Sequence, residues 1–211
     1  MSFITQQYDR LCKLKSDINE HLPTLMHLAT RCESVAEMGV RDVVSTWAFL
    51  EGFRNSTKTK KHLYSVDIVD VPYKDVIAYV AKKENINFKF VHDNSATVTL
   101  PKVDLLFIDT WHVYGHLKRE LEHHHKNVKK YIVMHDTEVF KTQSESVVYD
   151  RNIEEESNES GYTPGEISKG IGYAIVEFLE AHPEWFVKGH YPDNNGLTVL
   201  ERKTKQKQPS A

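Results

Sequence analysis

The sequence predicts an α/β fold in which a mostly parallel sheet is covered by helices. Short apolar runs alternate with amphipathic segments along most of the chain, which is the pattern of strands joined by helical crossovers. Several apolar runs end in a carboxylate or a histidine. The last two runs flank the turn-forming segment 192–196, which predicts an antiparallel hairpin closing the sheet.

Length and composition narrow the class of protein. The 211 residues, 40% of them hydrophobic, suit one domain with a single core (31–203) preceded by a helical cap (1–30). A net charge of -3 gives no electrostatic basis for binding nucleic acid or a membrane. Two cysteines, Cys12 and Cys32, form neither a disulfide framework nor a zinc motif. With no long apolar run and no signal-peptide core at the N-terminus, we expect a soluble, cytoplasmic protein.

Residues 1–30 carry leucines and an isoleucine at helical spacing, and Pro23 is expected to split the segment into two helices. This cap packs either on the sheet or on a second copy of the chain, forming a homodimer. The spaced apolar residues are Leu11, Leu14, Ile18, Leu22 and Leu25.

A strand, a turn and a helix start are predicted over residues 35–50. Gly39 permits a tight turn after the strand 35–38, and Ser45 lies near the start of a helix at 47–50. A helix start presents free N–H groups, so Glu37 and Ser45 flank a place where a ligand would lie. An ordinary strand-to-helix turn is the alternative.

The next strand, within 62–71, carries Asp67. An acidic residue at this distance after a glycine turn is the usual partner of ribose hydroxyls. A helix over 73–84 follows, with Val76, Ile77, Val80 and Ala81 predicted on its inner side. The strand 87–91 then ends near Asp93 and Asn94, whose polar groups would reach a nucleobase edge.

Two further apolar runs, 103–108 and 131–134, are joined by a helix-compatible segment, 114–127. Parallel strands connected in this way end at the same edge of the sheet, where open α/β folds bind ligands. We therefore expect the residues that follow the two strands to meet there: Asp109, His112, His135 and Asp136. The consecutive histidines 123–125 are interpreted as part of a solvated helix face.

The polar, acidic segment 138–165 is predicted to be a long flexible loop, with a lid over the site as the alternative. A helix over 167–181 and strands over 185–190 and 197–201 complete the domain. The tail 204–211 is predicted to be disordered.

These motifs resemble class I S-adenosylmethionine-dependent methyltransferases, above all small-molecule O-methyltransferases acting on sugar and antibiotic hydroxyls. The segment Phe107-Ile108-Asp109 with His112 and Tyr114 is similar to the family's FIDxxHxY signature, and 134–137 is similar to its HDT strand end. The acidic-x-Gly turn at Glu37 and Gly39 also matches, although Val43 and Val44 stand where the family often has glycines.

The resemblance implies a Rossmann-like three-layer sandwich that binds S-adenosylmethionine and a divalent metal, Mg²⁺ or Mn²⁺. It implies a cofactor site made of Glu37, Gly39, Ser45, Asp67, Asp93 and Asn94. It also implies metal ligands at Asp109, Asp136 and His135, the third ligand being open between His135 and Glu138. The acceptor would be a small molecule or a glycan.

His112 is the candidate general base, because an imidazole next to a metal-bound hydroxyl can take its proton. Three alternatives stay open: a catechol-type O-methyltransferase, a nicotinamide-dependent oxidoreductase, and a non-catalytic ligand-binding domain. The oxidoreductase is disfavoured because Arg41 and Val44 occupy glycine positions of the G-x-G-x-x-G turn.

Overall fold

A computed structural model describes residues 2–203; the tail predicted to be disordered lies outside this range. The described chain forms one sheet of seven strands in the order β3-β2-β1-β4-β5-β7-β6. The strands are β1 (Ser34–Met38), β2 (His62–Asp67), β3 (Asn87–His92), β4 (Val103–Ile108), β5 (Val128–His135), β6 (Trp185–Tyr191) and β7 (Leu197–Arg202).

Strands β1 to β5 pair in parallel, and β7 runs antiparallel to both β5 and β6. The predicted α/β fold with a mostly parallel sheet and a C-terminal antiparallel hairpin is therefore confirmed. The parallel register brings the carboxyl ends of β1, β4 and β5 to one edge, since Met38 pairs with Ile108, and Ile108 with Met134.

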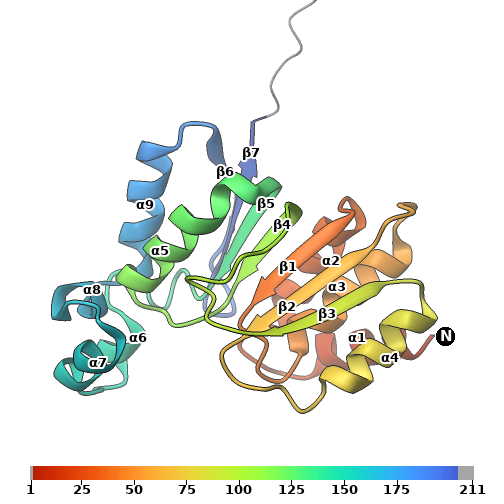
Figure 1. Ribbon diagram of the computed structural model, residues 1–211, viewed down its shortest axis with the longest axis horizontal. Coiled ribbons are helices and arrows are strands. Elements are labelled where there is room, and N and C mark those ends of the chain that lie inside the picture. Colours follow the sequence, from red (N-terminus) through yellow and green to blue (C-terminus); the bar gives the residue numbers. More distant parts are fainter. Residues whose placement is uncertain (1, 204–211) are drawn as a thin grey trace, which may run out of the picture.

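Helices cover both faces of the sheet, which makes three layers (Figure 1). The helices are α1 (Phe3–Lys13), α2 (Leu22–Thr30), α3 (Val44–Asn55), α4 (Lys74–Lys83), α5 (Tyr114–His124), α6 (Glu145–Val148), α7 (Ile153–Ser160), α8 (Pro164–Ser168) and α9 (Ile171–Ala181), with short 3-10 helices η1 (Asn19–His21) and η2 (His125–Asn127).

Alternating residues of each strand enter two different cores, as the period of two in a strand requires. Val35 and Leu105 point into the core shared with α1–α4, whereas Ala36 and Leu106 point into the core shared with α5 and α9. Strands buried on both faces read as continuous apolar runs, which explains why the 103–108 run was recognisable in the sequence.

The N-terminal cap folds onto its own chain. Pro23 lies in the first turn of α2, where its missing N–H costs nothing. It therefore marks the start of the second helix, and the predicted split of this segment into two helices is confirmed. The ring of His21 lies within 2.8 Å of the Asp193 carbonyl oxygen, and the Glu20 amide donates to Asn194 at 2.8 Å. These contacts fasten η1 to the β6–β7 turn. The homodimer stays a prediction.

Two side chains expected on inner faces are exposed. Leu14 is the C-cap of α1 rather than part of a continuous helix, and Val76 lies on the outer side of α4; they are 55% and 48% exposed. Leu14 is exposed because α1 ends before it, although the helical spacing of apolar residues continues past that point.

The prediction that segment 138–165 is a long flexible loop is wrong. The segment is not an irregular loop: it contains α6, α7 and the start of α8, which form a small lobe beside α5 in Figure 1. Its own small core consists of Val113, Tyr162 and Ile167 with partly buried Trp111 and Ile153. Side-chain caps from Ser144, Asn152 and Thr163 begin the three helices, and such local capping leaves no apolar periodicity to detect. A lid function stays a prediction.

Among the described residues, no helix combines the length and the apolar character needed to cross a membrane.

At Gly39 the backbone that follows β1 lies directly against the backbone that follows β4. Gly39 has φ +81°, and a Cβ built on it would lie 1.8 Å from the carbonyl oxygen of Asp109. We expect Gly39→Ala to lower the free energy of unfolding by several kcal/mol, because a clash with backbone adds to the strain of the left-handed conformation. Urea denaturation measures the effect.

Gly161→Ala is the matched control for Gly39→Ala. Gly161 also has a left-handed φ of +72°, but its added Cβ would meet nothing within 4 Å. The control should lose only the conformational part, on the order of 1 kcal/mol. Equal loss of stability in both variants would contradict the close approach at Gly39.

Candidate functional site

The site lies at the carboxyl edge where β1, β4 and β5 end. The Asp109 amide donates to the Met38 carbonyl at 2.8 Å, so the residue after β4 is fixed to the end of β1. Asp136 follows β5 directly and has φ +58°, a conformation uncommon for a residue with a Cβ. Strained backbone of this kind gathers at functional sites.

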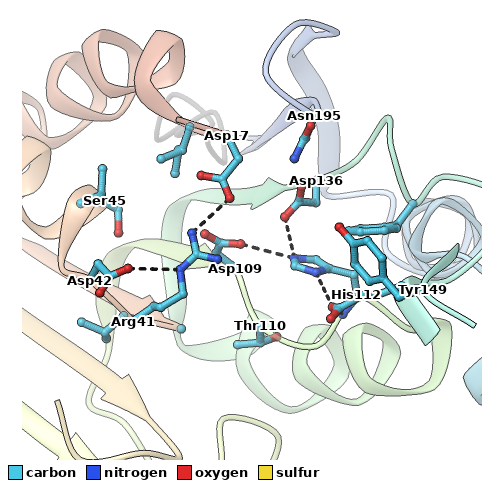
Figure 2. A pocket seen from close by; sticks show the side chains of 16 residues that line it. Asp17, Arg41, Asp42, Ser45, Asp109, Thr110, His112, Asp136, Tyr149 and Asn195 are labelled. Carbon is cyan, nitrogen blue, oxygen red and sulfur yellow. Dashed lines mark hydrogen bonds and ion pairs between the residues drawn. The ribbon is translucent and has the colours of Figure 1, made fainter. Parts of the chain in front are cut away.

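An imidazole lies between the two predicted carboxylates (Figure 2). Nε2 of His112 is 3.3 Å from Asp109 Oδ1 and 3.0 Å from Asp136 Oδ2. Its Nδ1 lies 2.9 Å from an oxygen of Glu145, which comes from α6. The structure thus brings together Asp109, His112 and Asp136 as the sequence predicted, and adds a third carboxylate.

His135 lies behind this group. Its Nδ1 is 3.2 Å from Asp136 and 3.5 Å from Asp109, and its Nε2 bonds the Asn194 carbonyl at 3.1 Å. With both ring nitrogens engaged and the side chain buried, His135 supports the two carboxylates from behind. One ligand atom each of Asp109, His112 and Asp136 lies within 4.8 Å of the others, a spacing that one cation could bridge. The assignment of His135 as a metal ligand stays a prediction.

The charges of the site are balanced internally. Burial alone would lower the pKa of His112 and raise those of Asp109 and Asp136, but their hydrogen bonds outweigh it. The pKa of His112 is therefore well above its usual value and those of the two carboxyl groups are well below theirs. For His135, burial opposes its bonds to the same carboxylates, and the pKa rises to about 10.

One oxygen of the site has no partner. Asp136 Oδ1 is buried and accepts no hydrogen bond within the described range. Because an unsatisfied buried carboxylate oxygen is costly, this atom is suited to a ligand that supplies positive charge. Carboxylate oxygens are also the ligands that Mg²⁺ and Mn²⁺ prefer. The residues present therefore fit a divalent cation.

Glu37 lies beneath the turn, not in it. It is completely buried, and its carboxylate accepts hydrogen bonds from Ser45 at 3.0 Å, Thr46 at 2.7 Å and Ser65 at 2.5 Å. Burial raises its pKa to about 7 against the three hydroxyl donors, which lower it. Glu37 thus ties the first turn of α3 to β2 and stands behind the cavity wall, whereas Gly39 and Ser45 line the cavity.

Asp67 also supports the turn. Its Oδ2 accepts the backbone N–H groups of Val40 at 2.8 Å and Arg41 at 3.1 Å, while Oδ1 accepts that of Val69 at 2.9 Å. The turn contains three residues with positive φ, Gly39, Arg41 and Val43, so these bonds hold a conformation that non-glycine residues disfavour. Val43 itself adopts a left-handed conformation, with φ +58°, and this is how the turn forms without a glycine at that position.

Asp93 and Asn94, the two residues predicted to contact a nucleobase, differ in position. Asn94 lines a cavity together with Asp67, but exposed Asp93 is not among the cavity-lining residues. A carboxylate oxygen of Asp93 instead accepts the Asn94 amide at 2.7 Å. The nucleobase contact of Asp93 stays a prediction.

Two adjoining cavities share the wall formed by Gly39, Arg41 and Asp109. The first, about 270 Å³, contains the Asp109–His112–Asp136 cluster. The second, about 500 Å³, extends from Asp67 towards α5 and the 138–165 lobe. Its lining is Gly39, Val40, Arg41, Val66, Asp67, Ile68, Asn94, Ser95, Asp109, Thr110, Trp111, His116, Glu159, Ser160 and Tyr162.

Several cavity residues were not anticipated from the sequence. Glu145 and Tyr149 come from the segment interpreted as a loop, and Asp17 comes from the link between α1 and η1. The guanidinium of Arg41 lies 3.1 Å from the Asp17 carboxylate, so the two reach across the first cavity in Figure 2. Only their position in the fold brings them there, and no motif marks them.

His116, in the first turn of α5, has a partner at each ring nitrogen. Its Nδ1 is 2.9 Å from the Tyr162 hydroxyl and its Nε2 is 3.1 Å from Ser95 Oγ, so it connects α5 to the 138–165 lobe and lines the second cavity. The histidines 123–125 are not a solvated face: His124 and His125 are buried. His124 is the last residue of α5, and His125 begins the short helix η2.

Comparison with solved structures gives the class of fold. A Staphylococcus aureus protein named as a caffeoyl-CoA O-methyltransferase is 12% identical with a TM-score of 0.61, covering 96% of this chain and 93% of its own. An O-methyltransferase of Bacillus cereus in complex with SAH is 12% identical with a TM-score of 0.53, covering 95% and 89%. An SAH-bound methyltransferase of Podospora anserina is 13% identical with a TM-score of 0.52, covering 95% and 88%.

No family model matches the chain, and no curated protein matches it in sequence. At the identities of the structural matches, the likeness concerns the fold: the chain has the Rossmann-like fold of class I methyltransferases.

The raised pKa of Glu37 predicts a pH-dependent stability. Its pKa is 4.5 ordinarily and about 7 in the folded chain, so the native state binds the proton more tightly. Its contribution is complete below pH 4.5 and is lost as the pH rises through 7, by about 3 kcal/mol at 1.4 kcal/mol per pKa unit. Denaturant unfolding between pH 5 and 8 should show that Glu37→Gln removes this part of the slope.

Glu120→Gln is the control with the opposite sign. Glu120 is also buried, but bonds from His116 and from hydroxyl groups outweigh burial and lower its pKa. Its contribution is present at neutral pH and is lost on acidification, so its replacement should flatten the acid side only. An unchanged slope between pH 5 and 7 in Glu37→Gln would show that the carboxyl group is ionised throughout.

Proposed function

We propose that the protein is an S-adenosylmethionine-dependent O-methyltransferase that methylates a hydroxyl of a small molecule or glycan, assisted by a divalent metal. The observation that carries the proposal is the pair of adjoining cavities. One cavity is bounded by Asp67 and the Gly39 turn, and the other holds the Asp109–His112–Asp136 cluster. A nucleoside-containing donor and a hydroxylated acceptor each have a place, and the shared wall is where they would meet.

The second cavity suits the adenosyl half of the cofactor. Gly39 allows close approach of the backbone, and Asn94 offers hydrogen-bonding groups to a base. Asp67 spends three of its roughly four acceptor positions on backbone amides, which leaves Oδ1 able to accept a ribose hydroxyl. The SAH-bound neighbours of the same fold support this choice of cofactor.

Asp109 and Asp136 would hold the metal. Their oxygens lie next to the first cavity, and the unpartnered Oδ1 of Asp136 supplies a free ligand position. A divalent cation there would lower the pKa of an acceptor hydroxyl and orient it. Glu138, the other candidate third ligand, pairs with His190 and Lys141 instead, so water completes the shell in this proposal.

His112 would remove the acceptor proton. Glu145 bonds its Nδ1 and fixes the ring, leaving Nε2 directed at the two aspartates. With its own proton in place, His112 neutralises these carboxylates and cannot act as a base. It becomes a competent base when another positive charge takes over that role, because its pKa is raised chiefly by the same two aspartates.

The first cavity favours a polyhydroxylated acceptor over a catechol. Asp17, Arg41 and Asn195 offer hydrogen-bonding groups at its rim. Two aromatic residues, Phe140 and Tyr149, provide apolar surface of the kind that stacks on a sugar ring. The preference for a sugar otherwise rests on the sequence resemblance. A catechol-type acceptor and a non-catalytic ligand-binding role are the alternatives.

Calorimetric titration with S-adenosylhomocysteine tests the cofactor. We expect micromolar binding, weakened at least tenfold by Asp67→Ala, because the variant loses both the ribose acceptor and the support of the turn. Asp70→Ala is the control: Asp70 is an exposed carboxylate three residues later that pairs with Lys74 outside the cavities. The absence of binding by the folded parent protein would exclude the methyltransferase proposal and favour the alternatives.

Methyl transfer from radiolabelled S-adenosylmethionine to a panel of sugars and catechols tests the acceptor and metal site in the first cavity. We expect turnover that EDTA abolishes and that Mg²⁺ or Mn²⁺ restores. Asp136→Asn should lose metal binding and turnover together. His112→Ala should lower turnover by roughly 100-fold or more, the usual contribution of a general base, while S-adenosylhomocysteine affinity changes by less than about threefold.

Metal affinity separates the two roles open to His112. Unchanged Mn²⁺ affinity in His112→Ala together with lost turnover supports the base assignment. Loss of both would make His112 a metal ligand. Normal turnover in this variant would leave neither role.

A further inference from the structure

A second cluster of metal-ligating side chains lies far from the carboxyl edge. It consists of Glu122 near the end of α5, His125 in η2, and His182 at the C-cap of α9. Helix α5 runs back from the carboxyl edge towards the start of β5, and its 11 residues span about 16 Å. The cluster therefore occupies the opposite end of the molecule, near the upper ends of α5 and α9 in Figure 1.

The three side chains are already arranged around one point. One ligand atom from each lies within 4.8 Å of the others. Nε2 of His182 is 2.9 Å from a Glu122 oxygen, and the imidazole rings of His125 and His182 have centroids 4.1 Å apart. Ligand atoms around a tetrahedral zinc ion stand about 3.4 Å apart, so small side-chain rotations would complete the geometry.

His125 supplies independent evidence for a ligand. The residue is only 2% exposed, yet both Nδ1 and Nε2 lack a hydrogen-bond partner in the part of the chain that the structure describes. The nearest acidic oxygen, from Glu184, is 3.8 Å from Nδ1. A buried imidazole that leaves both nitrogens unsatisfied forfeits hydrogen bonds on each. His135 shows the contrast, because both of its nitrogens are bonded.

The ligand types select the metal. Imidazole nitrogen together with one carboxylate suits Zn²⁺, Ni²⁺ or Co²⁺, whereas Mg²⁺ prefers oxygen throughout. Glu184 lies 3.8 Å from His125 and 3.7 Å from Arg202, outside the group of three, so water would complete the zinc shell. We propose that Glu122, His125 and His182 bind a zinc ion that clamps the end of α5 to the end of α9.

The clamp would act on the scaffold. It joins two helices that cover the same face of the sheet, and α5 begins next to His112 while α9 begins next to the 138–165 lobe. Binding to the native state alone stabilises it by mass action, so zinc should raise the melting temperature. This inference does not depend on the proposed methyl transfer.

Zinc titration of the untagged, metal-free chain tests the clamp. The titration uses the Asp109→Asn/Asp136→Asn background, so that the first cluster does not contribute. We expect one zinc per chain with micromolar or tighter affinity and a rise in melting temperature. His182→Ala should weaken binding at least tenfold and abolish the rise, and Glu122→Gln should weaken it less. Glu122 is exposed, whereas His182 is half-buried against His125 and Phe178, so far-ultraviolet circular dichroism without zinc checks that each variant folds as the parent does.

His27→Gln is the control, since His27 is an exposed histidine on α2 outside the cluster. It should bind zinc as the parent does. Cobalt gives a second readout, because a tetrahedral site with nitrogen ligands produces visible absorption that His182→Ala should remove. The clamp is excluded if the parent binds no zinc, or if His182→Ala and Glu122→Gln bind zinc and cobalt as the parent does.

Discussion

The close approach of the β1 and β4 ends is the constraint on which the site depends. Gly39 has its α-carbon against the carbonyl of Asp109, leaving no room for a side chain. This contact sets the position of the turn that begins α3 and, at the same time, the direction in which Asp109 leaves the sheet. The two cavities share this wall because both strand ends form it. The buried carboxylate of Glu37 then holds the turn from below.

Charge balance is the second organising feature. Asp136 is buried and Asp109 is half-buried, and ionised carboxylates in such places need positive partners. His135 provides one from behind as a fixed support, and His112 provides another from the cavity side. The difference in position matters, because His112 lines the first cavity whereas His135 does not. His135 is thus the fixed positive charge and protonated His112 the replaceable one. Such an arrangement is suited to a cation that takes the place of the His112 charge.

Helix α5 connects the two ends of the molecule. Its first turn follows the loop that carries Asp109 and His112, and its last turn leads into the buried His125 of η2. The 138–165 lobe packs against the first half of α5 through His116 and Tyr162. A clamp at the far end would therefore fix the helix from which one wall of the second cavity is built.

The sequence by itself determined the α/β class, the polar residues that follow successive strands, and the meeting of Asp109, His112 and Asp136. Apolar periodicity and parallel crossovers follow from local rules, which is why the sequence carries them. Tertiary structure decided the rest. Glu145 reaches His112 from a segment whose helices depend on caps and on packing against α5. His125 is buried where it begins η2 at the end of α5. Contacts between residues distant in the chain are set by how the layers pack, and spacing carries no record of them.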